Sequence, residues 1–319
     1  MLSLEPANRY LADTLTDKYV TPTSLDQSFV DFDSVRYHLS TPNTKLKNQL
    51  LLSMDVPCWS ELETYGARDV LEREYGTLLL PKDESEDGYS VSLSIDLEKG
   101  PQSLQERQQL ITSISLLKRN ALAAPFERAF SIHKELEASP QLEGSAPDPV
   151  QPVMSIHYRP SEAIYLIPSR DRVTCIFSTI FKEETDRILG RVFLQEFVDA
   201  RRRPSCQTAP QVLYSNREPP LEIRHLKGLD MTEKAGYVTF VLFPRHMIKN
   251  QTSESTITQI QLFRDYLHYH IKCSKAYLHS RLRVRTNEFL KVLNRAKPDE
   301  SLKEEKDRKT ASGRSFVRS

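Results

Sequence analysis

Residues 253–297 read SESTITQIQLFRDYLHYHIKCSKAYLHSRLRVRTNEFLKVLNRAK, and no proline or glycine occurs before Pro298. Apolar residues recur at helical spacing throughout, so the stretch predicts one long helix that begins in a Ser/Thr-rich cap region. At 1.5 Å per residue, about 45 residues would form a helix roughly 65 Å long, about twice the width of a small domain. Such a helix has too much surface to pack solely against its own domain.

The apolar residues of this helix form two stripes at roughly 100° per residue. The first stripe contains Ile257, Ile260, Phe263, Leu267, Ile271, Leu278, Leu282, Phe289 and Leu293. The second stripe, centred roughly 120° away, contains Tyr266, Tyr269, Cys273, Tyr277 and Val284. Two stripes predict two packing partners, and the sequence leaves open which stripe meets the chain's own sheet and which meets another chain.

A line of basic residues runs along the same helix. Its members are His268, Lys272, Lys275, His279 and Arg283, and no acid occurs between Asp265 and Glu288. One interpretation is a solvated face whose long side chains lie along the helix surface. An exposed helix would, however, normally interleave charges for i,i+4 support. The absence of acids therefore favours a surface for an acidic protein partner.

Composition narrows the class of protein. A length of 319 residues suggests two domains, and the formal net charge of +1 argues against a surface built entirely for nucleic acid or anionic membrane. The four cysteines lie far apart, which is typical of buried thiols in a reducing compartment. The first residues have no basic and apolar signal-peptide regions, and no run approaches 18 apolar residues. A cytosolic protein is predicted.

The hydrophobic pattern predicts an α+β fold of two duplicated modules, each with three strands, a helix, two strands and a helix, built as an antiparallel sheet with helices on one face. The first module should contain a helix over 5–20, strands over 29–32, 35–39 and 49–54, a helix over 59–75 weakened by Gly66, strands over 78–80 and 89–95, and a helix over 103–138 with a bend at Pro125. The second should contain strands over 153–158, 163–167 and 173–181, a helix over 183–200, strands over 211–214 and 237–243, and then the long helix.

Predicted domain boundaries follow from these elements. The first module covers 1–138, a Pro-rich linker covers 139–152, the second module covers 153–250, and the long helix covers 251–298. The tail over 299–319 alternates acids and bases with few apolar residues, so we expect it to be disordered.

Motifs for chemistry are missing from the sequence. The nine glycines form neither G-x-G-x-x-G nor G-x-x-x-x-G-K-[ST], and no G-x-S-x-G elbow occurs. The acidic turn at 83–88 resembles half a calcium loop, but its twelfth position is Ser94 instead of a bidentate Glu, which favours a solvated hairpin tip. His268 and His270 point about 200° apart on a helix and so cannot share a metal. We predict no enzyme activity, no catalytic residue, no metal site and no cofactor.

Several segments resemble the subunit 2 family, the large scaffold subunits of the actin-related protein 2/3 complex. They are GYVTFVLFPRH at 236–246, FRDYLHYHIKCSKAY at 263–277 and FLKVLNRA at 289–296, with shorter matches at 89–98, 117–120, 208–214 and 217–222. The likeness is specific over the second half and patchier before residue 75. The linker over 139–152 and the tail depart from the family pattern.

This resemblance implies a non-enzymatic scaffold in the seven-subunit assembly that nucleates branched actin filaments in the cytoplasm, at the cortical actin cytoskeleton. It implies partners as well: subunit 4 through an antiparallel helix pair, the actin-related subunits, and the mother filament. The candidate filament contacts are Lys272, Lys275, Arg281, Arg283, Lys291 and Arg295. The candidate residues for packing against the partner helix are Ile260, Phe263, Leu267, Ile271, Leu278, Leu282 and Phe289. Nucleic acid and membrane insertion are not expected.

Two alternatives remain open at this point. A single-stranded nucleic-acid-binding protein would use the basic helix, although aromatic stacking platforms and overall basicity are missing. A homodimer would pair two copies of the long helix.

Overall fold

Two antiparallel sheets and their helices make up the computed structural model, which describes residues 4–139, 151–200 and 202–296. The chain divides into two compact units, Met1–Ile271 and Lys272–Ser319, and both sheets belong to the first. The α+β class with two antiparallel sheets and a long C-terminal helix is confirmed. The predicted linker at 139–152 and the tail at 299–319 fall almost entirely outside the described residues, and the domain boundaries stay predictions.

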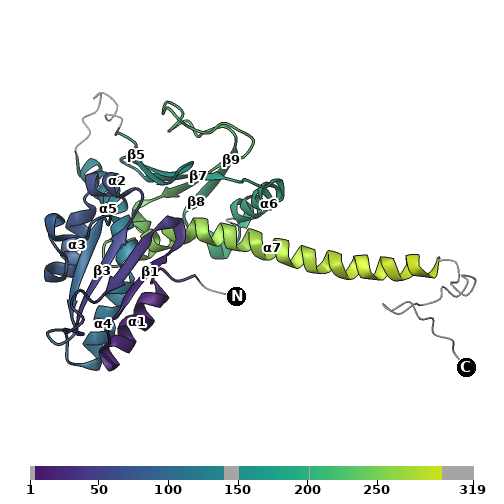
Figure 1. The fold of residues 1–319 in the computed structure, drawn as a ribbon. Coiled ribbons are helices and arrows are strands. Elements are labelled where there is room, and N and C mark those ends of the chain that lie inside the picture. The colour runs from purple at the N-terminus through teal and green to yellow at the C-terminus, as the bar shows by residue number, and fades with distance from the viewer. Residues whose placement is uncertain (1–3, 140–150, 201, 297–319) are drawn as a thin grey trace, which may run out of the picture. The chain divides into compact units, whose positions relative to one another are not determined.

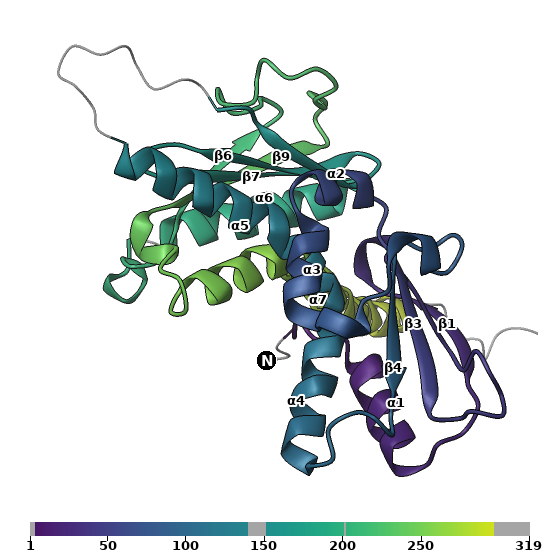
Figure 2. The same ribbon diagram turned by 90° about the vertical axis from the view of Figure 1, so that its left-hand side faces the viewer.

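The first sheet has the order β1-β2-β3-β4, with β1 at Asp26–Val30, β2 at Arg36–Ser40, β3 at Gln49–Asp55 and β4 at Val91–Asp96. Its register places Leu39 opposite Leu52, and Leu52 opposite Leu93, so one face carries a row of buried leucines. Helices α1 (Arg9–Val20), α3 (Ala67–Tyr75) and α4 (Leu104–Ser115) lie on the same side of these strands, as Figure 2 shows.

The second sheet has the order β5-β6-β7-β9-β8. Figure 1 labels its strands β5, β7, β8 and β9. Its strands are β5 at Met154–Arg159, β6 at Glu162–Pro168, β7 at Val173–Ile180, β8 at Gln211–Asn216 and β9 at Ala235–Leu242. Every residue of β9 is buried, because one face meets α6 (Glu184–Ala200) and α7 (Ser253–Arg295), and the other meets an apolar cluster that includes Ile223. The predicted order of elements in this module is confirmed.

Three details of the first module differ from the prediction. The segment over 59–75 forms two helices, α2 (Trp59–Thr64) and α3, because Gly66 between them has a left-handed φ of 90°. The segment over 78–80 is not a strand: a 3-10 turn at Gly76–Leu78 is followed by one bridge between Leu79 and Leu93. The turn leaves too little extended chain for a ladder.

The helical segment over 103–138 breaks at Leu116 and not at Pro125. Leu116 has a ψ of 8°, which ends α4 and starts α5 (Leu117–Ala138). Pro125 is buried inside α5. The helix continues past it, although proline has no N–H group to donate the usual backbone hydrogen bond. The change of direction therefore comes from the backbone at Leu116, a position with no proline or glycine signal.

Both sheets share one hydrophobic core with the first half of α7. Phe263 lies 4.8 Å from Phe240 of β9 and 5.4 Å from Phe177 of β7, measured between ring centroids. Both pairs are edge-to-face, the arrangement that the ring quadrupoles favour. Burial of each such side chain contributes about 1.5–3 kcal/mol, so the aromatic cluster fixes α7 firmly on the second sheet.

Gly190 allows α6 to approach this core closely. A Cβ atom at this position would lie 2.7 Å from Phe181 Cε1 and 3.2 Å from Ile271 Cδ1. Gly190→Ala should therefore lower the free energy of unfolding by about 1–3 kcal/mol through overpacking, despite the better helix propensity of alanine. Urea unfolding of the purified chain, followed by circular dichroism, measures the change. Val192→Ala on the exposed face of α6 is the matched control, and equal stability of the two variants would contradict the close approach.

Candidate interaction surfaces

The first half of α7 is buried in the chain's own core. Of the seven residues predicted to pack on a partner helix, four are almost fully buried: Ile260, Phe263, Leu267 and Ile271 are 4%, 8%, 0% and 1% exposed. The other three are open within the described chain, since Leu278 is 45%, Leu282 61% and Phe289 63% exposed. The first half of this stripe therefore packs in the chain's own core, and only its second half is accessible to another chain.

The second stripe begins under the N-terminal segment. The Leu4 N–H donates to the Tyr266 hydroxyl oxygen at 2.9 Å, and that hydroxyl donates to the Leu4 carbonyl at 3.1 Å. Further along, Tyr277 is 62% and Val284 55% exposed. The helix therefore exposes apolar side chains of both stripes beyond Ile271.

The six predicted filament contacts form two lines on α7. At roughly 100° per residue, Lys272, Lys275 and Arg283 fall within about 80° of one another, and so do Arg281, Lys291 and Arg295. The centres of the two lines are roughly 150° apart, with Leu278, Leu282 and Phe289 between them. All six side chains are exposed except Lys275, which is half-buried. We call these sets the first basic line and the second basic line.

Neighbouring side chains differ between these lines. In the second basic line, the Arg281 guanidinium stacks over the Tyr277 ring at 5.6 Å. Close by on the helix, Arg285 donates to Glu288 at 2.9 Å, which pairs one base with the first acid after the acid-free run. The first basic line lies wholly inside that run.

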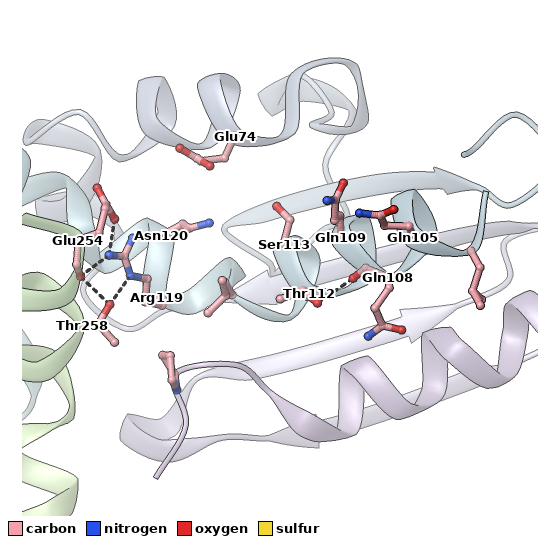
Figure 3. A pocket seen from close by; sticks show the side chains of 13 residues that line it. Glu74, Gln105, Gln108, Gln109, Thr112, Ser113, Arg119, Asn120, Glu254 and Thr258 are labelled. Carbon is pink, nitrogen blue, oxygen red and sulfur yellow. Dashed lines mark hydrogen bonds and ion pairs between the residues drawn. The ribbon is translucent and has the colours of Figure 1, made fainter. Parts of the chain in front are cut away.

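A groove of about 1120 Å³ runs along α4 (Figure 3). Glutamine side chains of α4 line one part of it, and Arg119 closes the other. The Arg119 guanidinium is already satisfied, since it donates to the Glu254 carboxylate at 2.5 Å and to the Thr258 hydroxyl at 3.1 Å. The Asn120 amide likewise donates to the Tyr75 hydroxyl at 3.0 Å. The exposed lining of the groove is mainly apolar, and its polar side chains do not bring a nucleophile and a base into contact.

Metal-ligand clusters are also missing from the described part of the chain. The acidic turn at 83–88 makes a structural contact, because the Glu86 carboxylate accepts a hydrogen bond from the His38 ring at 2.6 Å. Within the same described residues, no helix is both long and apolar enough to cross a bilayer.

Six charged side chains meet where the two sheets approach each other. They are Asp33, Lys118, Arg159, Glu162, Arg264 and Asp265. Asp33, in the turn between β1 and β2, accepts from Arg159 at 2.9 Å and lies 3.4 Å from the Lys118 ammonium. Arg264 of α7 donates to Glu162 of β6 at 2.8 Å. The three acids and three bases balance, so the cluster joins both sheets, α5 and α7 without a net charge.

Asp265 is the least well compensated acid of this ionic cluster. Its side chain is only 10% exposed, and the nearest base, Arg264, is 3.6 Å away and already bonded to Glu162. Burial, followed by repulsion from Asp33, raises the pKa of Asp265 from 3.8 to about 6. The ionised form of Asp265 therefore opposes folding near neutral pH.

Comparison with known proteins identifies the family. Residues 52–300 match the family model of the Arp2/3 complex 34 kD subunit p34-Arc. Actin-related protein 2/3 complex subunit 2 of Schizosaccharomyces pombe is 52% identical over 328 aligned positions that cover 100% of both chains. The protein of the same name from Dictyostelium discoideum is 38% identical over 300 positions, 94% of each chain. The chain belongs to the p34-Arc family. It is a structural subunit of the Arp2/3 complex.

Membership of the p34-Arc family gives these surfaces a context. The matched region includes both sheets from β3 onward and all of α7. A subunit must present surfaces to other chains, and the exposed apolar residues of α7 are of the kind that permanent interfaces bury. Sequence reasoning identified α7 and its basic residues, but it missed the ionic cluster, whose members lie up to 232 positions apart between Asp33 and Asp265.

The ionic cluster yields a prediction with a defined sign. Because the folded pKa of Asp265 is raised, stability should increase as the pH falls from about 6 towards 4. Asp265→Asn should stabilise this p34-Arc chain by about 1–2 kcal/mol at pH 7, and its unfolding should lose that pH dependence. Urea unfolding at pH 7 and pH 5 measures both effects. Asp33→Asn is the matched control, and it should be destabilising because Arg159 and Lys118 lose their acceptor. Destabilisation by both variants would contradict the assignment.

Proposed function

We propose that this chain is the non-enzymatic scaffold of the Arp2/3 complex, the assembly that nucleates branched actin filaments, and that it anchors the complex to the mother filament. The observation that carries the proposal is the division of α7. Its first half lies in the core, while residues 276–296 are exposed and carry apolar and basic side chains side by side. An apolar face suits a permanent partner, and a charged face suits a reversible one.

The permanent partner is subunit 4. Its equivalent helix would lie antiparallel on the face formed by Leu278, Leu282 and Phe289, which are open in the described chain. Burial of these three side chains would contribute about 1.5–3 kcal/mol each. The pair would hold the actin-related subunits, which carry out ATP hydrolysis, so this subunit needs no cofactor of its own.

The reversible partner is the mother filament, whose surface is acidic. The first basic line is the better candidate for this contact, because it lies in the acid-free run of α7. We place the protein in the cytoplasm, at cortical actin structures, as expected for a subunit that anchors filament branches. The domain boundaries at 138, 152, 250 and 298 belong to the same proposal.

Reversal of two charges tests the filament contact. Lys272→Glu with Lys275→Glu should leave assembly intact and weaken binding of the complex to actin filaments about three- to tenfold, because attraction becomes repulsion. Cosedimentation with filaments at low salt measures the affinity. Arg281→Glu with Arg295→Glu makes the same change on the second basic line and shows which flank of α7 faces the filament. Unchanged cosedimentation of both pairs would reject α7 as the contact.

Replacement of apolar residues on α7 by aspartate tests the pairing with subunit 4. Leu278→Asp with Leu282→Asp should abolish copurification of the two subunits, since charged residues cannot be buried in an apolar interface. Tyr277→Asp with Val284→Asp, on the second stripe, is the matched control and should leave copurification intact. Normal assembly of the leucine variant, or loss in the control alone, would show that the helix pairs through another face.

The same preparations separate the alternatives. A chain that is soluble alone and sediments as a dimer would favour pairing of two copies. Steeply salt-dependent binding of an oligonucleotide would favour the nucleic-acid alternative.

A further inference from the structure

One end of the second sheet carries a basic surface made by two segments far apart in sequence. Gln211, the first residue of β8, pairs with Val241 near the end of β9. Residues 202–210 and 243–249, which precede β8 and follow β9, therefore meet at the same end of the sheet. The two segments are joined directly, because His246 contacts the Thr208 carbonyl at 2.8 Å.

The neutral side chain of His246 joins these two segments through hydrogen bonds. Its Nδ1 atom accepts the Phe243 N–H at 3.0 Å, and its Nε2 atom lies 2.8 Å from the Thr208 carbonyl oxygen and 3.2 Å from Arg245 Nε. Burial lowers the pKa of His246, which keeps the ring neutral near pH 7. The 202–210 segment is thus fixed to the turn between β9 and α7, and the basic residues of both segments share one surface.

No acid occurs in residues 200–217 or in residues 234–253. Four exposed bases of these two segments form what we call the basic rim: Arg202, Arg203, Arg245 and Lys249. The Arg202 side chain is 86% exposed and forms one ion pair of 3.8 Å, with Asp199. In the turn between β6 and β7 at the same end of the sheet, Arg172 is paired with Asp171, to which it donates at 2.7 Å.

The chemistry of the basic rim indicates a reversible protein partner. Permanent subunit interfaces are depleted in charge at their centres and rich in apolar groups. The rim contributes four positive charges beside a single exposed large apolar side chain, Ile248, which is 45% exposed. Three of its four bases are arginines, whose planar fork binds carboxylates in a bidentate manner. These features fit an acidic protein surface met in a salt-sensitive encounter.

We propose that the basic rim is a second contact for the acidic surface of the actin filament, separate from the basic lines of α7. The inference rests on the proposed function, in which the complex binds a mother filament. Two patches of like charge, one at the end of the second sheet and one on α7, would add their attraction at low ionic strength and raise the association rate.

Charge reversal in the assembled complex tests the rim. One variant carries Arg202→Glu with Arg203→Glu, and the other carries Arg245→Glu with Lys249→Glu. Each should weaken cosedimentation with actin filaments about three- to tenfold at low salt and less at high salt, since the contacts are exposed. Lys45→Glu with Lys47→Glu makes the same charge change in the loop between β2 and β3, where both lysines are exposed, and should have no effect.

The outcomes separate the rim from the α7 contact. Weaker binding by both rim variants while Lys272→Glu with Lys275→Glu has no effect would support the rim and reject the first basic line. The reverse pattern would overturn the rim alone, and unchanged binding by all variants would reject both.

Three further results would overturn the rim as a filament contact. They are loss of a subunit from both the glutamate and the glutamine variants of the rim, a loss of filament binding confined to one of the two segments, and weaker binding to vesicles containing 20% phosphatidylserine with filament binding unchanged. The corresponding rim variants with glutamine test whether the side chains are needed for folding. If the glutamine variants assemble and also bind filaments more weakly, the rim proposal stands.

Discussion

Burial of Phe263 against Phe177 and Phe240 is the contact on which the rest of the molecule depends. It fixes the first half of α7 to the second sheet, and the same core continues through Leu267 and Ile271. Helix α7 runs from Ser253 to Arg295, and its residues from Lys272 onward belong to the second compact unit. The core therefore covers the apolar stripe only as far as Ile271, and the later apolar residues stay exposed.

The ionic cluster imposes a second constraint, on the junction of the two sheets. Buried charges are costly to desolvate, and a balanced set of acids and bases is stable only when every partner is in place. Asp33 adopts a left-handed φ of 63° to reach Arg159 and Lys118, a conformation that aspartate tolerates better than most residues. The cluster therefore contributes more to the specificity of this arrangement than to stability, and the raised pKa of Asp265 is the sign of that cost.

Sequence pattern predicted the second module well and the first less well. Strands such as β7 and β9 are long apolar runs, and α7 has a clear period, so their identity follows from local periodicity. The break at Leu116 has no local signal, because it is set by packing of α4 and α5 on different neighbours. The sequence indicated that Gly66 weakens a helix. It could not distinguish a glycine inside a helix from a glycine whose left-handed φ separates two helices.

The candidate surfaces show the same limit. Periodicity identified the apolar stripe of α7 but could not divide it between Ile271 and Leu278, since burial depends on which strands lie opposite. The two basic lines of α7 follow from helical periodicity alone, so the sequence was sufficient to separate them. The two acid-free segments of the basic rim are also visible in the sequence, but their meeting at one end of the sheet follows only from the pairing of β8 with β9.

The apolar and the charged surfaces are expected to form complexes of different lifetimes. Exposed leucines and Phe289 on α7 are unfavourable in water, so a partner that covers them should stay bound once assembled. Arginines and lysines lose hydration when they pair, so their contacts form and break readily and respond to salt. Under the proposed function, a subunit that carries both kinds of surface on α7 would remain in its complex while the complex itself binds and releases a charged filament.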